Sequence, residues 1–85
     1  MNINLNAENS ASQTRQILAW MQAGNRINPM EALRRFGSFR LGARIKDIET
    51  IIGRPPSRQR IQVENRMGKA VWVNEYWLEE EKQGE

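Results

Sequence analysis

Residues 28–52 have the sequence NPMEALRRFGSFRLGARIKDIETII, and this stretch decides the fold of the 85-residue chain. Asn28 is a favoured helix N-cap, because its side-chain oxygen accepts a hydrogen bond from a free backbone N–H of the first turn. Pro29 suits the first helical position, and Glu31 stands at the capping-box spacing. Gly37 tolerates the left-handed conformation that ends a helix. These signals predict a short helix between Asn28 and Gly37.

A second helix is predicted directly after this turn, over residues 38–52, with Ser38 as its N-cap. Its apolar residues recur at helical spacing, as a core-facing stripe requires: Leu41, Ile45, Ile48 and Ile52. The outward side carries small, polar and basic residues: Arg40, Ala43, Lys46 and Thr50. A short helix, a tight turn and a second helix with a basic outer face form the skeleton of a helix-turn-helix.

Two segments precede this unit. Residues 12–23 place Ile17, Leu18 and Met21 on one side of a predicted first helix, with Ser12 in the position of its cap. Residues 1–11 are rich in Asn, Ser and Ala without a sustained period, which predicts a mobile N-terminal arm.

After residue 56 the apolar period changes from that of a helix to the twofold alternation of a strand. Two alternating runs, residues 60–64 and 70–74, are separated by the turn-rich residues 65–69, which predicts a β-hairpin. Three helices followed by a hairpin give an α+β fold of the winged-helix type, with the hairpin as the wing.

The C-terminal end of the hairpin shows a change of phase. Tyr76 and Leu78 alternate out of step with the valines at 71 and 73, so a bulge is expected near residues 74–75. Residues 79–85 form an acidic C-terminal tail. The folded domain is therefore expected to cover residues 12–78.

The composition excludes several classes of function. Without cysteine or histidine, the chain lacks thiolate zinc ligands and the commonest general base. No phosphate-cradling glycine loop marks a catalytic site, so we expect no enzyme, no cofactor and no metal. No apolar run approaches the roughly 18 residues that span a bilayer, and the polar N-terminal residues are unlike a secretory signal. We therefore expect a cytoplasmic protein with no membrane partner.

The charge is unevenly distributed, although the net value is only +3. Residues 34–69 hold ten Lys and Arg against three Asp and Glu, a net +7, whereas residues 70–85 hold one Lys against five Glu, a net −4. A field of one sign in the middle of a small domain attracts a polyanion, which favours nucleic acid as the partner. The alternative interpretation is an arginine-rich solvated surface.

Several motifs, taken in order, resemble the small helix-turn-helix domains that are frequent in bacteriophage and prophage genomes. The resemblance covers about residues 13–78 and rests on residues 16–18 (QIL), 28–33 (NPMEAL), 39–47 (FRLGARIKD), 63–69 (VENRMGK) and 75–78 (EYWL). It implies a winged helix-turn-helix that binds double-stranded DNA in a bacterial host cell and regulates transcription or recombination. The turn after Gly37 is longer than in a repressor, so repressor contact positions are not transferred.

The helix over residues 38–52 is the predicted recognition element, because its outward residues reach base edges when it enters a major groove. Arg40 is the first candidate for base contact, since a guanidinium holds both acceptors of a guanine. The other candidates for base contact lie along the same side of the helix: Ala43, Lys46 and Thr50. Phosphate contacts are predicted at the helix start, on its flank and in the hairpin: Ser38, Arg44, Arg58, Arg60, Arg66 and Lys69. The alternatives are that Ser38 only caps the helix and that the cations only solubilise the surface.

Two positions near this face leave alternatives open. Gly42, next to Ala43, admits either the close approach of a DNA backbone or tight packing against a neighbouring helix. Asp47 is expected either to orient Arg44 or Arg40 or to accept from a cytosine amino group, and pairing with a neighbouring arginine across a helical turn is favoured.

The three tryptophans predict a further surface. Trp72 and Trp77 stand where hairpins of this type are polar, and Trp20 lies at the edge of the first helix's apolar side. Exposed tryptophan marks interfaces, which favours contact with a protein, either a second copy of the chain or a host protein. The alternatives are packing over the first helix and stacking on an unpaired base. A protein-interaction module that modulates host machinery is therefore the second hypothesis for function.

Overall fold

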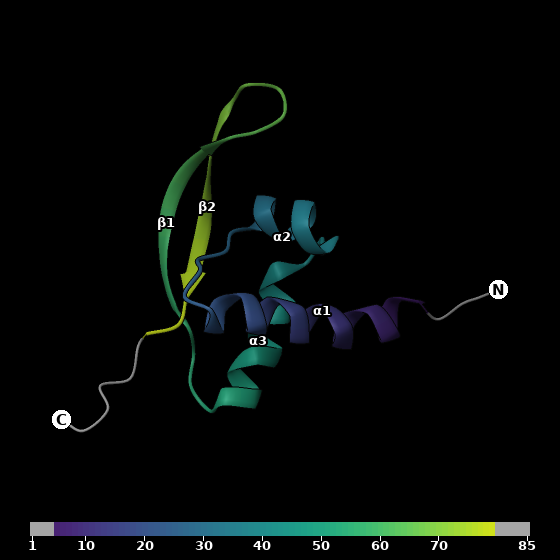
Figure 1. The fold of residues 1–85 in the computed structure, drawn as a ribbon. Helices are drawn as coiled ribbons and strands as arrows, with labels where there is room; N and C mark the ends of the chain where they lie inside the picture. The colour runs from purple at the N-terminus through teal and green to yellow at the C-terminus, as the bar shows by residue number, and fades with distance from the viewer. Residues whose placement is uncertain (1–4, 80–85) are drawn as a thin grey trace.

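The structure is a computed structural model and describes residues 5–79. It contains α1 (Leu5–Gln22), α2 (Pro29–Phe36), α3 (Leu41–Ile52), β1 (Ser57–Glu64) and β2 (Ala70–Trp77). The three helices pack together, and the two antiparallel strands form a hairpin beside them whose tip extends beyond the helices (Figure 1). This arrangement confirms the predicted fold class, an α+β winged helix-turn-helix.

The signals predicted to bound α2 are confirmed. The side chain of Asn28 accepts a hydrogen bond from the backbone N–H of Glu31 at 3.0 Å, and Pro29 occupies the first helical position. The helix ends at Gly37, which adopts the left-handed conformation with φ of 68°. A cap of this kind contributes about 1 kcal/mol, a substantial share for a helix too short to be stable alone.

The core lies between the helices and the base of the hairpin. Its buried apolar residues are Ile17, Met21, Ile27, Ala32, Leu41, Ile45, Ile48 and Tyr76. The predicted stripe on α3 is confirmed, since three of its four residues are buried and Ile52 packs against the core. The outer side of α3 is therefore fixed by the burial of the inner side.

The linker between α1 and α2 fastens the hairpin to the helices. Ile27 and Tyr76 exchange two backbone hydrogen bonds, of 2.9 and 2.8 Å, in an isolated antiparallel bridge. Next to this bridge, Arg26 Nη1 lies 3.3 Å from Glu75 Oε1. These contacts set the position of the wing relative to the helices.

The first helix begins at Leu5, not at Ser12, so residues 5–11 are helical although the sequence predicted an arm there. The rest of the predicted arm and residues 80–85 of the predicted acidic tail lie outside the described residues. In the part of the chain that the structure describes, no helix has the length and apolar content required to cross a lipid bilayer.

The bulge predicted near residues 74–75 is absent. The strands pair without interruption from Ser57 opposite Trp77 to Glu64 opposite Ala70. No bulge is needed because one face of the hairpin packs against the helices at its base, while the opposite face is partly buried further along the wing. Tyr76 is buried against the helices at the base, whereas the valines at 71 and 73 are half-buried on the opposite face further along the wing.

Candidate nucleic-acid interface

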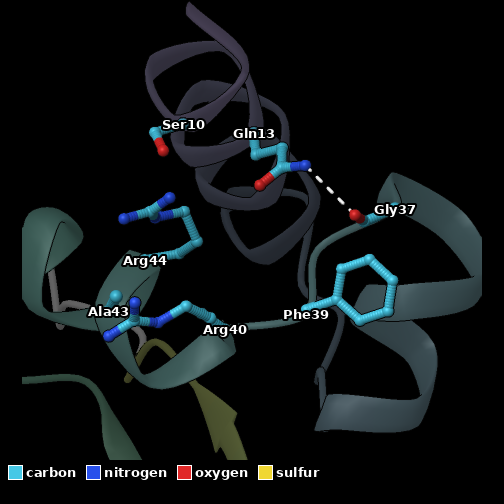
Figure 2. A pocket seen from close by; sticks show the side chains of 7 residues that line it. All are labelled: Ser10, Gln13, Gly37, Phe39, Arg40, Ala43 and Arg44. Carbon is cyan, nitrogen blue, oxygen red and sulfur yellow. Dashed lines mark hydrogen bonds between the residues drawn. The ribbon is translucent and has the colours of Figure 1, made fainter. Parts of the chain in front are cut away.

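The turn between α2 and α3 is held by three hydrogen bonds. The backbone N–H groups of Gly37 and Ser38 donate to the carbonyls of Leu33 and Ala32, at 3.0 and 3.1 Å. From α1, Nε2 of Gln13 donates to the carbonyl of Gly37 at 3.2 Å (Figure 2). The start of α3 is thereby fixed relative to both preceding helices.

Ser38 does not cap α3, contrary to the sequence prediction. The helix begins at Leu41, with Arg40 in the N-cap position and no side-chain hydrogen bond to the first turn. Ser38 is 2% exposed, and its Oγ has no hydrogen-bond partner among the described residues. Its backbone N–H completes the end of α2 instead, and its side chain lies in the interior.

The four residues predicted for base contact lie at the start of α3 and on its outer side. Arg40, Lys46 and Thr50 are exposed, and Ala43 is half-buried. Thr50 Oγ1 donates to the carbonyl of Lys46 at 3.3 Å, a bond within the helix that leaves the hydroxyl oxygen available as an acceptor. The three polar side chains are therefore accessible from solvent, and their contact with bases stays a prediction.

A hollow lies between the N-terminal half of α1 and the start of α3 (Figure 2). Gln13 contributes from α1, and Arg40, Ala43 and Arg44 contribute from α3 and its cap. Figure 2 shows the two guanidinium groups directed to the same side of the hollow and the ring of Phe39 on the other side. This flank of α3 thus presents two cations next to its uncapped first turn.

The two arginines of this hollow, Arg40 and Arg44, differ in exposure to solvent and in pairing with a carboxylate. The Arg44 side chain is 14% exposed, and its Nε lies 3.3 Å from Asp47 Oδ2 without the N–H being aimed at that oxygen. Thr14 of α1 donates to the same Oδ2 at 3.2 Å. Asp47 was expected to pair with Arg44 or Arg40, and the structure pairs it with Arg44 through an electrostatic contact. Arg40 is left as the exposed cation of the hollow.

A groove on the other flank of α3 lies between this helix and β1. Gly42, Lys46 and Glu49 line it from α3, and Arg58 lines it from the strand. A Cβ atom placed on Gly42 would meet no other atom within 4 Å. Among the described residues, no helix packs tightly against this position. The close approach of another molecule to Gly42 stays a prediction.

Arg58 and Arg60 lie on the face of the hairpin that meets α3 at its base. Arg58 stands opposite the buried Tyr76, and Arg60 stands opposite Asn74. Residues two apart along a strand point to the same face, so both arginines face the same way. Both are exposed, as their predicted role in phosphate contact requires.

The tip of the hairpin is ordered by its own hydrogen bonds. Asn65 Oδ1 accepts from the backbone N–H of Met67 at 2.9 Å and of Lys69 at 3.0 Å, while Gly68 adopts φ of 81°. Arg66 and Lys69 are exposed at this tip, where the sequence predicted them. The end of the wing that is furthest from the helices therefore presents two exposed cations.

The three tryptophans predicted to form an interface differ in their surroundings. Trp20 packs edge-on against Phe36 at 6.1 Å and lies under the guanidinium of Arg35 at 4.3 Å. Trp77 lies under the guanidinium of Arg26 at 3.9 Å. Both indoles are half-buried and serve the fold, whereas Trp72 is 58% exposed.

Two further exposed residues near the candidate interface are not among the site residues predicted from the sequence. Phe39, in the turn before α3, is 86% exposed, and Met67, at the wing tip, is 82% exposed. A signal for Phe39 was present, because it falls outside the apolar stripe of α3. Met67 stands in the turn-rich tip, where a side chain has few neighbours.

The fold and this surface define a winged helix-turn-helix whose outer helix face and wing face are basic. The family model of the winged helix-turn-helix domain matches residues 12–81, so the chain belongs to this family. Membership indicates DNA as the partner. No curated protein and no solved structure matches the chain.

Proposed function

We propose that this chain binds double-stranded DNA with α3 in the major groove and the hairpin as a wing against the flanking backbone. The observation that carries the proposal is the side of α3 opposite the core, where Arg40 and Lys46 are exposed. Arg58 of the wing borders the same groove as Lys46, so two elements present cations to one partner. Cations that neutralise phosphates supply the sequence-independent share of affinity.

Specificity is proposed for the outer side of α3. Arg40 stands at the start of the helix, where side chains of a recognition helix meet base edges, and its exposed guanidinium has the geometry to hold both acceptors of a guanine. Ala43, Lys46 and Thr50 continue this side along the groove. Gly42 leaves room for the backbone of α3 to approach the DNA.

Phosphate contact is proposed for the exposed cations of the wing: Arg58, Arg60, Arg66 and Lys69. Arg44 contributes less, because Asp47 already offsets its charge. The motifs that resemble phage and prophage domains support a role in regulating transcription or recombination, within the cytoplasm of a bacterial host.

A protein-interaction module is the second candidate, and the exposed Trp72 favours it. A second copy of the chain or a host protein would cover this indole. Trp20 and Trp77 no longer support this candidate, because both pack within the chain.

Binding of labelled duplexes at several salt concentrations tests the proposed function. Arg58→Ala should weaken binding and flatten the dependence of affinity on salt, because one phosphate contact is lost. Arg15→Ala, which removes an equal charge from the exposed side of α1, should change both much less. Equal effects of the two variants would show that net charge, and not the groove, governs binding.

A further inference from the structure

The register of the hairpin decides which way Trp72 faces. Trp72 stands directly opposite Gln62, and side chains two residues apart along a strand point to the same face. Trp72 therefore shares a face with Arg58, Arg60 and Tyr76. Among residues 5–79, guanidinium groups cover Trp20 and Trp77 but not Trp72, which keeps 58% of its surface exposed.

This face of the hairpin continues the groove beside α3. Arg58 and Tyr76 border that groove together with Gly42 and Lys46 of the helix. Trp72 precedes Tyr76 by four residues, which places its indole about 13 Å further out along the wing. The indole thus lies on the extension of the surface that the proposed function turns toward DNA.

The surroundings of Trp72 are polar. Gln62 faces it across the strands, and Asn74 and Arg60 follow on the same face toward the base. Toward the tip the same face carries Glu64 opposite Ala70. The centre of a protein interface is apolar and depleted of charge. An indole beside amides, on a face where arginines outnumber the carboxylate, is instead typical of surfaces that stack on nucleosides while cations hold the phosphates. The net positive charge of this face, with Arg58 and Arg60 against Glu64, favours a nucleic acid over a protein as the occupant.

We propose that Trp72 is a nucleic-acid-contacting residue, whose indole lies flat against a nucleoside of the strand that follows the wing. This inference rests on the proposed DNA binding and adds an aromatic contact to it. In a continuous duplex the accessible ring is a deoxyribose, and at an end or fork it is an unpaired base. Removing such a contact weakens binding by roughly 5- to 150-fold.

The test combines affinity with indole fluorescence. Trp72→Ala and Trp72→Phe are compared with wild type on a blunt duplex and on the same duplex carrying an unpaired overhang. Ile51→Ala is the matched control, because Ile51 is an apolar residue of α3 with the same 58% exposure. Trp72 lies on the surface, so its variants should melt at the wild-type temperature.

We expect Trp72→Ala to lose affinity, Trp72→Phe to lose less, and Ile51→Ala to bind as wild type. Quenching of indole fluorescence by DNA should be reduced in both Trp72 variants, which keep the half-buried Trp20 and Trp77 as a background. A larger loss on the overhang duplex identifies an unpaired base as the contact, and an equal loss identifies the sugar.

Unchanged affinity and unchanged quenching in Trp72→Ala would overturn the inference while leaving DNA binding intact. A dimer that dissociates in Trp72→Ala, with normal affinity for DNA, would overturn it in favour of a protein interface. If the wild-type chain binds no duplex at low salt, both this inference and the proposed function fail.

Discussion

Replacing Gly42 with alanine should stabilise the fold and weaken its binding to DNA. Gly42 is exposed in the first turn of α3, and a Cβ atom there meets nothing within 4 Å. Alanine is favoured over glycine by about 0.8–1.0 kcal/mol in a helix interior, and somewhat less near a helix end. We therefore expect the free energy of unfolding to rise by about 0.5–1 kcal/mol, which raises Tm by roughly 2–8 °C in a domain of this size.

The same methyl group should interfere with DNA. Gly42 lines the groove between α3 and Arg58, so any side chain there stands between the helix backbone and a bound strand. Gly42→Ala should weaken binding a few-fold, and Gly42→Leu by about tenfold or more, equivalent to about 1.4 kcal/mol. Ala19→Leu, which adds bulk to an exposed position of α1, should leave affinity unchanged.

Thermal denaturation and fluorescence anisotropy of a labelled duplex measure the two effects separately. A fall in Tm for Gly42→Ala would refute the reasoning, because it would mean that glycine serves packing or backbone geometry. Full affinity in Gly42→Leu would refute the close approach of DNA to this flank of α3.

Three further predictions concern single side chains. Asn28→Ala should lower the free energy of unfolding by about 1 kcal/mol through loss of the α2 cap, measured by denaturant titration, and an unchanged midpoint would contradict the role of the cap. Arg40→Ala should weaken binding to a preferred duplex more than to random duplex, whereas Arg66→Ala should weaken both similarly and reduce the salt slope by about 1. Asp47→Asn should strengthen binding at low salt by releasing Arg44 as well as by removing a carboxylate, and therefore more than Glu49→Gln; equal gains would show that Arg44 is not released.

The parts of the fold that local chemistry decides were predicted from the sequence. The cap at Asn28 and the end of α2 at Gly37 depend on neighbouring backbone groups, and both are confirmed. The stripe of α3 was predicted because one helix face must be buried wherever the helix packs. The pairing of Arg44 with Asp47 followed from the spacing of one helical turn.

The errors arose where tertiary contacts decide. Ser38 has the residue type of a cap, but its backbone N–H closes the end of α2 and α3 begins three residues later at Leu41. Trp20 and Trp77 find arginines that are distant in the sequence, so their half-burial was not predictable from spacing. The hairpin has no bulge because its outer part extends past the helices, where neither face of the strands has to pack against the core (Figure 1).

The most direct test of the central claim is selection of bound duplexes from a random pool, carried out in parallel with wild type and Arg40→Ala. The account predicts that wild type enriches a common sequence and that Arg40→Ala loses the preference at one base pair while retaining the rest. Enrichment of no sequence by the wild type, or an identical enriched sequence from Arg40→Ala, would contradict the assignment of base contact to the start of α3.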